Sequence, residues 1–127
     1  WPRVEQTLQN IAKAAPESSL SLHDLDDGRD LYKTIRRCDI LSNATRVGMA
    51  PEVERSVITD QSCFRPELVV TDVVYAPPET KLLRDAKAAG CKTCDGLGML
   101  LWQGVAAFKL FTDKDMPAQE VLEKFFS

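Results

Sequence analysis

The sequence lacks the features of several broad classes of protein. No apolar run is long enough to span a membrane, and the opening stretch WPRVEQTLQN has neither the basic nor the apolar region of a secretory signal peptide. The net charge is −3 and the 16 basic residues are scattered, which is not the charge pattern of a nucleic-acid-binding surface. We therefore expect a cytoplasmic protein that binds neither membranes nor nucleic acids.

Histidine and paired cysteines are also scarce. The sequence has one histidine, His23, and four cysteines without the spacing of a disulfide framework. Cys91 and Cys94 form a Cys-x-x-Cys pair, but residues three apart in a strand point to opposite faces, so the two thiols would diverge. We expect the cysteines to be small buried hydrophobic residues rather than metal ligands or a redox pair. We expect His23 to lie at a strand end rather than in a catalytic triad.

What is present is a globular composition with alternating periodicities. With 44% hydrophobic and 28% charged residues, the 127 residues suffice for one domain. Helical spacing predicts helices over residues 3–15, 26–38, 82–89, 97–111 and 115–126, with a short helical turn within ITDQSCF. Strands are predicted in SLSLHDL (19–25), CDILSNA (38–44), ELVVTDVVY (67–75) and CKTC (91–94).

Helices that alternate with strands predict a parallel α/β sheet. In such sheets ligands bind beyond the carboxyl ends of the strands. In this chain those ends are His23–Leu25, Ser42–Thr45, Val74–Ala76 and Asp95–Gly98. Functional residues are therefore expected in the loops that follow the strands.

Three motifs at these ends resemble one enzyme family. ILSNATRVGM (40–49), VVTDVVYAPPETKLLRDAKAAGCKT (69–93) and DGLGMLLWQG (95–104) resemble the second half of shikimate dehydrogenases, most closely the quinate/shikimate branch. The resemblance runs from about Asp39 to the C-terminus. It implies a partial Rossmann-like fold, a doubly wound and mainly parallel sheet flanked by helices, with a C-terminal helical segment. It also implies an oxidoreductase of aromatic amino-acid biosynthesis that moves a hydride between NAD or NADP and a cyclic hydroxy acid, shikimate or quinate.

The chain departs from the family pattern at its beginning. The family has an N-terminal substrate domain with a catalytic lysine and aspartate, and its cofactor domain opens with a glycine-rich phosphate-binding turn. No GxGxxG pattern occurs here, and the sequence does not begin with methionine. We therefore expect residues 1–127 to be a single domain, the C-terminal portion of the NAD(P)-binding domain, inactive by itself and with weak or absent cofactor binding. The alternative is a non-catalytic binding or interaction module derived from that domain.

The resemblance also assigns residues to the site. It implies cofactor binding by Asn43, Thr45, Arg46, Gly48, Met49, Val73, Gly96 and Met99, and substrate binding by Tyr75 and Gln103. Arg46 stands where the quinate branch has a lysine near the cofactor, and Ala76 replaces the asparagine that usually follows the tyrosine. The choices between NAD and NADP, and between shikimate and quinate, stay open because the deciding residues would precede Trp1.

The residues by themselves leave other interpretations open. Gln103 follows Gly96 by close to two helical turns, so both would lie on one side of the helix, with the amide able to bind a hydroxyl. An exposed helix residue is the alternative for Gln103. Tyr75 could instead cap the core, and Asn43 could satisfy the backbone of a turn. Asp72, to which we give no catalytic role, could be a hydrogen-bonded buried carboxylate or could face solvent.

The absent strands lead to a last expectation. A complete domain of this kind orders its strands 3-2-1-4-5-6, and this chain is expected to supply only the third to the sixth. CDILSNA would then lack the first strand as its neighbour, and SLSLHDL would lack the second. Because an edge of unpaired backbone groups is unfavourable, either these two strands pair within the chain or another copy covers the edge. We expect self-association, as a two-fold dimer built on that edge or on the apolar sides of the helices at 3–15 and 97–111.

Overall fold

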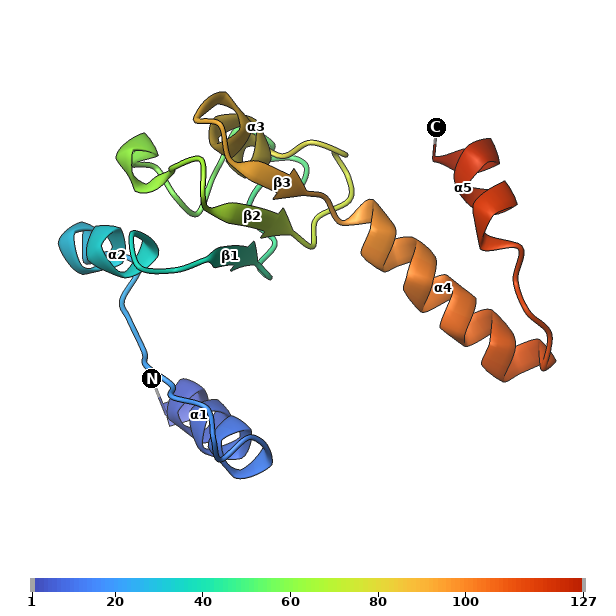
Figure 1. Cartoon of the computed structure of the whole chain (residues 1–127), viewed down its shortest axis with the longest axis horizontal. Coiled ribbons are helices and arrows are strands. Elements are labelled where there is room, and N and C mark those ends of the chain that lie inside the picture. Colours follow the sequence, from blue (N-terminus) through green and yellow to red (C-terminus); the bar gives the residue numbers. More distant parts are fainter. Residues whose placement is uncertain (1, 127) are drawn as a thin grey trace. The chain divides into compact units, whose positions relative to one another are not determined.

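The computed structural model describes residues 2–126, which divide into two compact units, one ending at Leu31 and one beginning at Tyr32. The first unit contains α1 (Pro2–Ala14) and the beginning of α2 (Gly28–Ile35), which continues into the second unit (Figure 1). Both helices were predicted from apolar periodicity and are confirmed. The amphipathic α1 buries none of its residues, because its apolar positions find no cover among residues 2–31.

The strand predicted over residues 19–25 is wrong. These residues form neither helix nor strand, and Leu20 and Leu22 remain 40% and 42% exposed. An extended segment becomes a strand only when a neighbour pairs with its backbone, and among residues 2–126 the ladders join other segments. His23 therefore lies in a loop, where Nδ1 contacts the Asp30 carboxylate and Nε2 contacts the Ser21 hydroxyl.

The second unit is built on a three-stranded parallel sheet in the order β1-β2-β3. Its strands are β1 (Ile40–Asn43), β2 (Val69–Asp72) and β3 (Lys92–Cys94), so three of the four predicted strands are confirmed in shorter form. The register pairs Ile40 with Val69 and Asn43 with Asp72. All strands run in one direction, which places their carboxyl ends at the same edge (Figure 1). Within the described residues β1 is an edge strand, as the missing-neighbour argument predicts.

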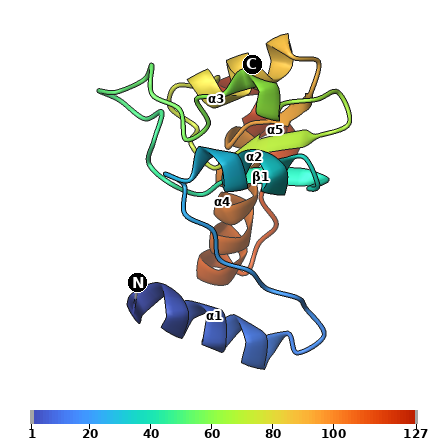
Figure 2. The same cartoon turned by 90° about the vertical axis from the view of Figure 1, so that its left-hand side faces the viewer.

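Between β1 and β2 the chain makes a long excursion. Residues 44–60 have no helix or strand and appear in Figure 2 as a teal-to-green trace leaving β1. The chain then forms the predicted helical turn η1 (Gln61–Cys63), held at its start by the Asp60 side chain, which accepts a hydrogen bond from the Ser62 N–H. Arg65 donates to the backbone carbonyls of Ile35 and Cys38, and this contact ties the end of α2 to the segment that enters β2.

One face of the sheet is covered by α3 (Lys81–Ala88). Its apolar residues Leu82, Leu83 and Ala86 are buried. Thr80 caps its first turn, and Gly90, at φ +84°, takes the left-handed conformation that ends a helix. The largest fully buried side chains of the core are Ile58, Leu68, Leu82, Val70, Thr80 and Cys63. The face of β1 that carries Ile40 is uncovered, since the Ile40 side chain is 62% exposed.

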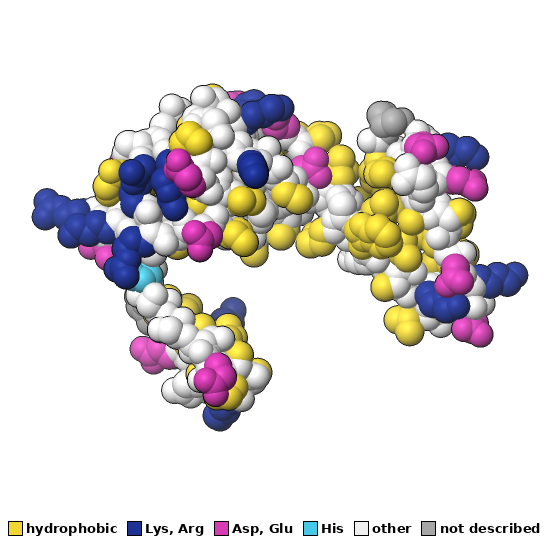
Figure 3. Space-filling model, in the orientation of Figure 1, with side chains coloured by type: hydrophobic (Ala, Val, Ile, Leu, Met, Phe, Trp, Pro, Cys, Tyr) yellow, Lys and Arg dark blue, Asp and Glu magenta, His cyan; other side chains and the backbone are white. Residues whose placement is uncertain are grey.

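Two helices complete the second unit, α4 (Leu97–Thr112) and α5 (Ala118–Phe125), and they contact each other. Of the apolar α4 only Leu101 is buried. Leu110 and Phe111 are 84% and 87% exposed, and Trp102 is 64% exposed. Figure 3 shows hydrophobic side chains gathered at the surface of this helical pair. Among residues 2–126 no helix combines the length and the apolar character needed to cross a bilayer.

Candidate functional site

A pocket of about 220 Å³ lies at the carboxyl ends of β1 and β2, where parallel sheets bind their ligands. Its walls are two loops, one following each strand. The lining residues are Ala44, Thr45, Arg46, Met49, Val73, Val74, Tyr75 and Ala76. The apolar side chains of this lining suit a flat ring, and Arg46 and Tyr75 add a cation and a phenolic hydroxyl.

The first wall is shaped by Asn43, the last residue of β1. Its Oδ1 accepts hydrogen bonds from the backbone N–H (3.0 Å) and the hydroxyl (2.7 Å) of Thr45, and its Nδ2 donates to the Val47 carbonyl (3.2 Å). Asn43 is buried at 3% exposure and does not line the pocket. The structure therefore places it as a turn-forming residue that fixes the loop from Ala44 to Met49.

The second wall follows Asp72, the last residue of β2. Asp72 Oδ1 accepts from the Val74 backbone N–H (2.9 Å), which turns the chain out of the ladder. This turn explains why the predicted strand 67–75 is shortened to end at Asp72. The carboxylate is 3% exposed and fully hydrogen-bonded, which decides between the two interpretations left open for it.

Two glycines stand where a side chain would not fit, one because of its backbone conformation and one because of its close neighbours. Gly48 has φ +94°, a conformation that side chains rarely adopt, and a Cβ there would lie 3.4 Å from the Thr80 Cβ. A Cβ on Gly96 would lie 2.5 Å from the Val73 carbonyl oxygen and 2.8 Å from that of Val74. Gly96 thus lets the beginning of α4 pack against the pocket wall, and the space beside its Cα is filled by backbone.

The ten predicted site residues divide into two groups. Those that the structure brings together in the pocket are Thr45, Arg46, Met49, Val73 and Tyr75. Those that lie outside its lining are Asn43, Gly48, Gly96, Met99 and Gln103. Met99 and Gln103 share one side of α4, four residues apart, and both are exposed. Tyr75 is 47% exposed at the pocket, so it does not cap the core.

The sequence arguments missed the polar group beneath the pocket. Asp72 Oδ1 also accepts from Asn43 Nδ2 (3.0 Å), and Asp72 Oδ2 accepts from the Thr80 hydroxyl (2.7 Å). Two signals were available in the sequence. Asp72 is an acidic residue inside a β-branched run, and Thr80 stands where a helix cap is expected, directly before KLL.

Residues with shifted pKa values lie elsewhere. Hydrogen bonds from the hydroxyl and the backbone N–H of Ser62 lower the pKa of the exposed Asp60 carboxyl. Burial raises the pKa of the Cys63 thiol, and the negative charge of Asp60 raises it further. Asp60 caps η1 and Cys63 is its last residue, and neither lines the pocket.

The cysteines agree only in part with expectation. Cys63 and Cys91 are buried, but Cys38 is half-buried and Cys94 is exposed, because the edge strand β3 leaves its side chains uncovered. Cys91 and Cys94 thus have different surroundings, although Cys91 precedes β3 and only Cys94 belongs to the strand. Among residues 2–126 no three His, Cys, Asp or Glu residues are placed to hold a metal ion.

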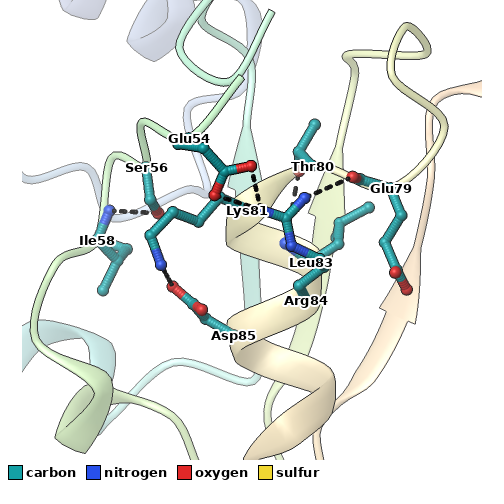
Figure 4. A network of polar contacts seen from close by, with 9 residues as sticks. All are labelled: Glu54, Ser56, Ile58, Glu79, Thr80, Lys81, Leu83, Arg84 and Asp85. Carbon is teal, nitrogen blue, oxygen red and sulfur yellow. Dashed lines mark hydrogen bonds and ion pairs between the residues drawn. The ribbon is translucent and has the colours of Figure 1, made fainter. Parts of the chain in front are cut away.

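A second cavity of about 310 Å³ lies between residues 54–59 and α3. Figure 4 shows its polar contacts: Arg84 reaches the Glu54 carboxylate at 2.7 Å, and Lys81 reaches Asp85 at 2.7 Å. The charges of this region therefore pair within the chain and tie the long loop to the helix.

The chain is similar in sequence to shikimate dehydrogenases. The family described as Shikimate 5'-dehydrogenase C-terminal domain matches residues 96–124. The chain is 46% identical over 128 residues to a shikimate dehydrogenase (NADP(+)) of Streptococcus uberis, covering 100% of this chain and 43% of the relative. It is 40% identical over 126 residues to that of Listeria monocytogenes serotype 4b, covering 99% of this chain and 43% of the relative.

Solved structures give the same picture. A shikimate 5-dehydrogenase from Listeria monocytogenes in complex with shikimate and NAD matches with TM-score 0.76 and 45% identity, over 81% of this chain and 36% of that chain. A quinate dehydrogenase from Corynebacterium glutamicum in complex with NAD matches with TM-score 0.78 and 35% identity, over 95% and 42%. These matches confirm the resemblance and the Rossmann-like fold class. The chain spans less than half the length of the curated relatives it matches.

Proposed function

Because the chain is similar to shikimate and quinate dehydrogenases over nearly its whole length, we propose that it acts as the C-terminal part of the cofactor-binding domain of such an enzyme. The reaction is hydride transfer between NAD or NADP and a cyclic hydroxy acid, shikimate or quinate. The observation that carries the proposal is the pocket at the carboxyl ends of β1 and β2, because the motifs that resemble the family form its walls. The hydride chemistry belongs to the nicotinamide when it is bound.

On the cofactor side, this chain contributes position and shape. Met49 and Val73 line opposite walls, and a flat ring between them would be shielded from water. Arg46 is exposed at the pocket and can pair with a phosphate or a carboxylate. The donor set and the apolar walls thus fit a nicotinamide ring with a charged group nearby. We assign Asn43, Gly48 and Gly96 to holding this region and Met99 to its α4 side.

On the substrate side, we assign Tyr75 and Gln103. The Tyr75 hydroxyl can donate a hydrogen bond to a carboxylate or accept one from a ring hydroxyl. The Gln103 amide can do both at once, and its exposed place on α4 leaves it accessible. Because Ala76 replaces an amide in the family pattern, Tyr75 would bind without the polar neighbour that the family usually supplies.

We propose that the 127-residue chain alone does not catalyse the oxidation of shikimate or quinate. The relatives it matches are more than twice as long, and the glycine-rich phosphate-binding turn has no counterpart in this sequence. The test is NAD(P)H formation with shikimate and quinate, measured for the pure chain and for the longest product of its coding region. We expect activity from a longer product that includes the missing parts and none from the chain. Turnover by the chain above a no-protein blank would contradict this, and a longer product inactive with all four combinations would contradict the assigned reaction.

We also propose a cytoplasmic location and self-association. A reducing compartment suits the four free thiols and holds the nicotinamide coenzymes that the proposed reaction needs. Self-association is supported by the β1 edge and by the exposed apolar residues of α4. The same exposed residues favour the second candidate function, a non-catalytic interaction module. Activity of a longer product would decide between the two.

A further inference from the structure

The last rung of the β1–β2 ladder carries a buried polar cluster. Asn43 and Asp72 are register partners, and Asn43 Nδ2 donates to Asp72 Oδ1. Thr80, at the start of α3, donates to the other carboxylate oxygen. The three residues are 3%, 3% and 0% exposed, so water does not substitute for these contacts. The cluster consists of Asn43, Asp72 and Thr80.

Both pocket walls begin at this cluster. The loop Ala44–Met49 follows Asn43 directly, and the segment Val73–Ala76 follows Asp72. The first rung beyond the strands is made by the Val73 N–H, which donates to the Asn43 carbonyl at 3.0 Å. A change in the Asp72 carboxylate therefore reaches both walls at their points of attachment.

The hydrogen bonds have one direction. Asp72 Oδ1 accepts from the Asn43 side-chain amide and the Val74 backbone N–H, and Asp72 Oδ2 accepts from the Thr80 hydroxyl, so both carboxylate oxygens are acceptors here. An asparagine of the same size would place an NH2 group where one of the two acceptor oxygens stands, so the Thr80 hydroxyl would have to reorient or the amide would face a backbone or side-chain N–H. The cluster therefore discriminates between a carboxylate and its neutral isostere.

We propose that Asp72 is a positioning residue for the pocket: its carboxylate sets the spacing of the two walls and anchors them to α3. The expected effect on catalysis rests on the proposed function. The positioning of the two walls by Asp72 does not depend on which reaction the pocket serves. Small misplacement of binding groups weakens ligand binding and the orientation of the reacting atoms together. Asp72 touches neither ligand in this role and acts through Asn43, Val74 and Thr80.

The structural test uses the 127-residue chain and its backbone amides. Three backbone amides donate to side chains here: Thr45 N–H to Asn43, Val74 N–H to Asp72, and Val47 N–H to the Thr45 hydroxyl. In Asp72→Asn we expect hydrogen exchange at these amides to accelerate by about tenfold or more, relative to the sheet amides. The matched control is Asp85→Asn, the same change at a carboxylate that is 15% exposed on α3 and outside this pocket. Equal acceleration in both variants, or a uniform change over the whole chain, would overturn the proposal.

The kinetic test uses the longest active product of the coding region. Asp72→Asn and Thr80→Val should each raise the KM for both cofactor and substrate, by roughly five- to tenfold. Thr80→Ser keeps the hydroxyl and should stay within about twofold of the parent. A lowered Tm and lowered kcat with unchanged KM values would show that Asp72 serves folding only. If the parent is inactive, the proposed function fails, and the exchange experiment still decides the positioning role.

Discussion

The loops at the carboxyl ends of β1 and β2 and the helix α4 are both rich in apolar residues, but only the first region lies over its own core. Beneath the loops, Leu68, Val70 and Leu82 are buried, and the buried side-chain polar groups of the described residues are hydrogen-bonded. On α4, Trp102, Leu110 and Phe111 remain exposed. The difference shows that this chain contains the support for its pocket walls, whereas α4 presents a surface suited to packing against other protein.

The largest expected effect concerns that exposed surface. If α4 and the β1 edge require cover, the purified chain should sediment at micromolar concentration as a dimer, with twice the mass of one chain. Phe111→Glu, which places a charge on the most exposed aromatic side chain of α4, should shift the equilibrium toward monomer if the helices form the contact. A well-folded monomer of the unmodified chain would contradict this contrast between the two regions, because α4 would then be stable without cover from another protein.

Truncating a leucine in each region should separate them by stability. Leu82→Ala removes a side chain that is 1% exposed and should lower the free energy of unfolding by about 2–5 kcal/mol. Leu110→Ala removes one that is 84% exposed and should change it by about 0.5 kcal/mol or less. Urea denaturation, at a protein concentration low enough to keep the chain monomeric, measures the free energy of unfolding of both variants. Equal losses would mean that α4 is packed in solution.

The junction between the two regions is tested at glycine. Gly96→Val would drive its side chain into the Val73 and Val74 carbonyls, which should cost about 1–3 kcal/mol of stability and impair cofactor use in an active longer product. The control is Gly98→Val on the same helix, where a Cβ meets nothing within 4 Å. Thermal unfolding and the KM for the cofactor compare the two variants. Equal changes in Tm and in the KM for the cofactor at both positions would contradict the role assigned to Gly96.

The smallest effect is expected at Gln103. In an active longer product, Gln103→Ala should lower kcat/KM for the hydroxy acid roughly two- to tenfold, because one hydrogen bond to a neutral hydroxyl, about 0.5–1.5 kcal/mol, is lost. The cofactor parameters should change little. Gln119→Ala, on the exposed face of α5, serves as control because its amide already donates to Glu123. An effect on the cofactor equal to that of Gly96→Val would contradict the division of roles along α4.

Much of the site was predictable from local sequence. The strand ends and the loops after them follow from apolar runs and their breaks, so Thr45, Val74 and Tyr75 could be placed at one edge of the sheet from the sequence. The placement of Gln103 was not predictable in the same way. Helical spacing puts it on one side of α4 with Gly96, but whether that side meets the pocket depends on what packs against the helix.

The helices, the three paired strands and the glycine at the end of α3 follow from local sequence, because apolar periodicity and backbone sterics act over a few neighbouring residues. Strand pairing and the contacts of buried polar groups depend instead on segments that are distant in the sequence. Residues 19–25 have a strand pattern but form no strand, since a ladder needs a partner from elsewhere in the chain. Asp72 became the support of the pocket because folding brings Asn43 to it from 29 residues away, and no local pattern encodes that meeting.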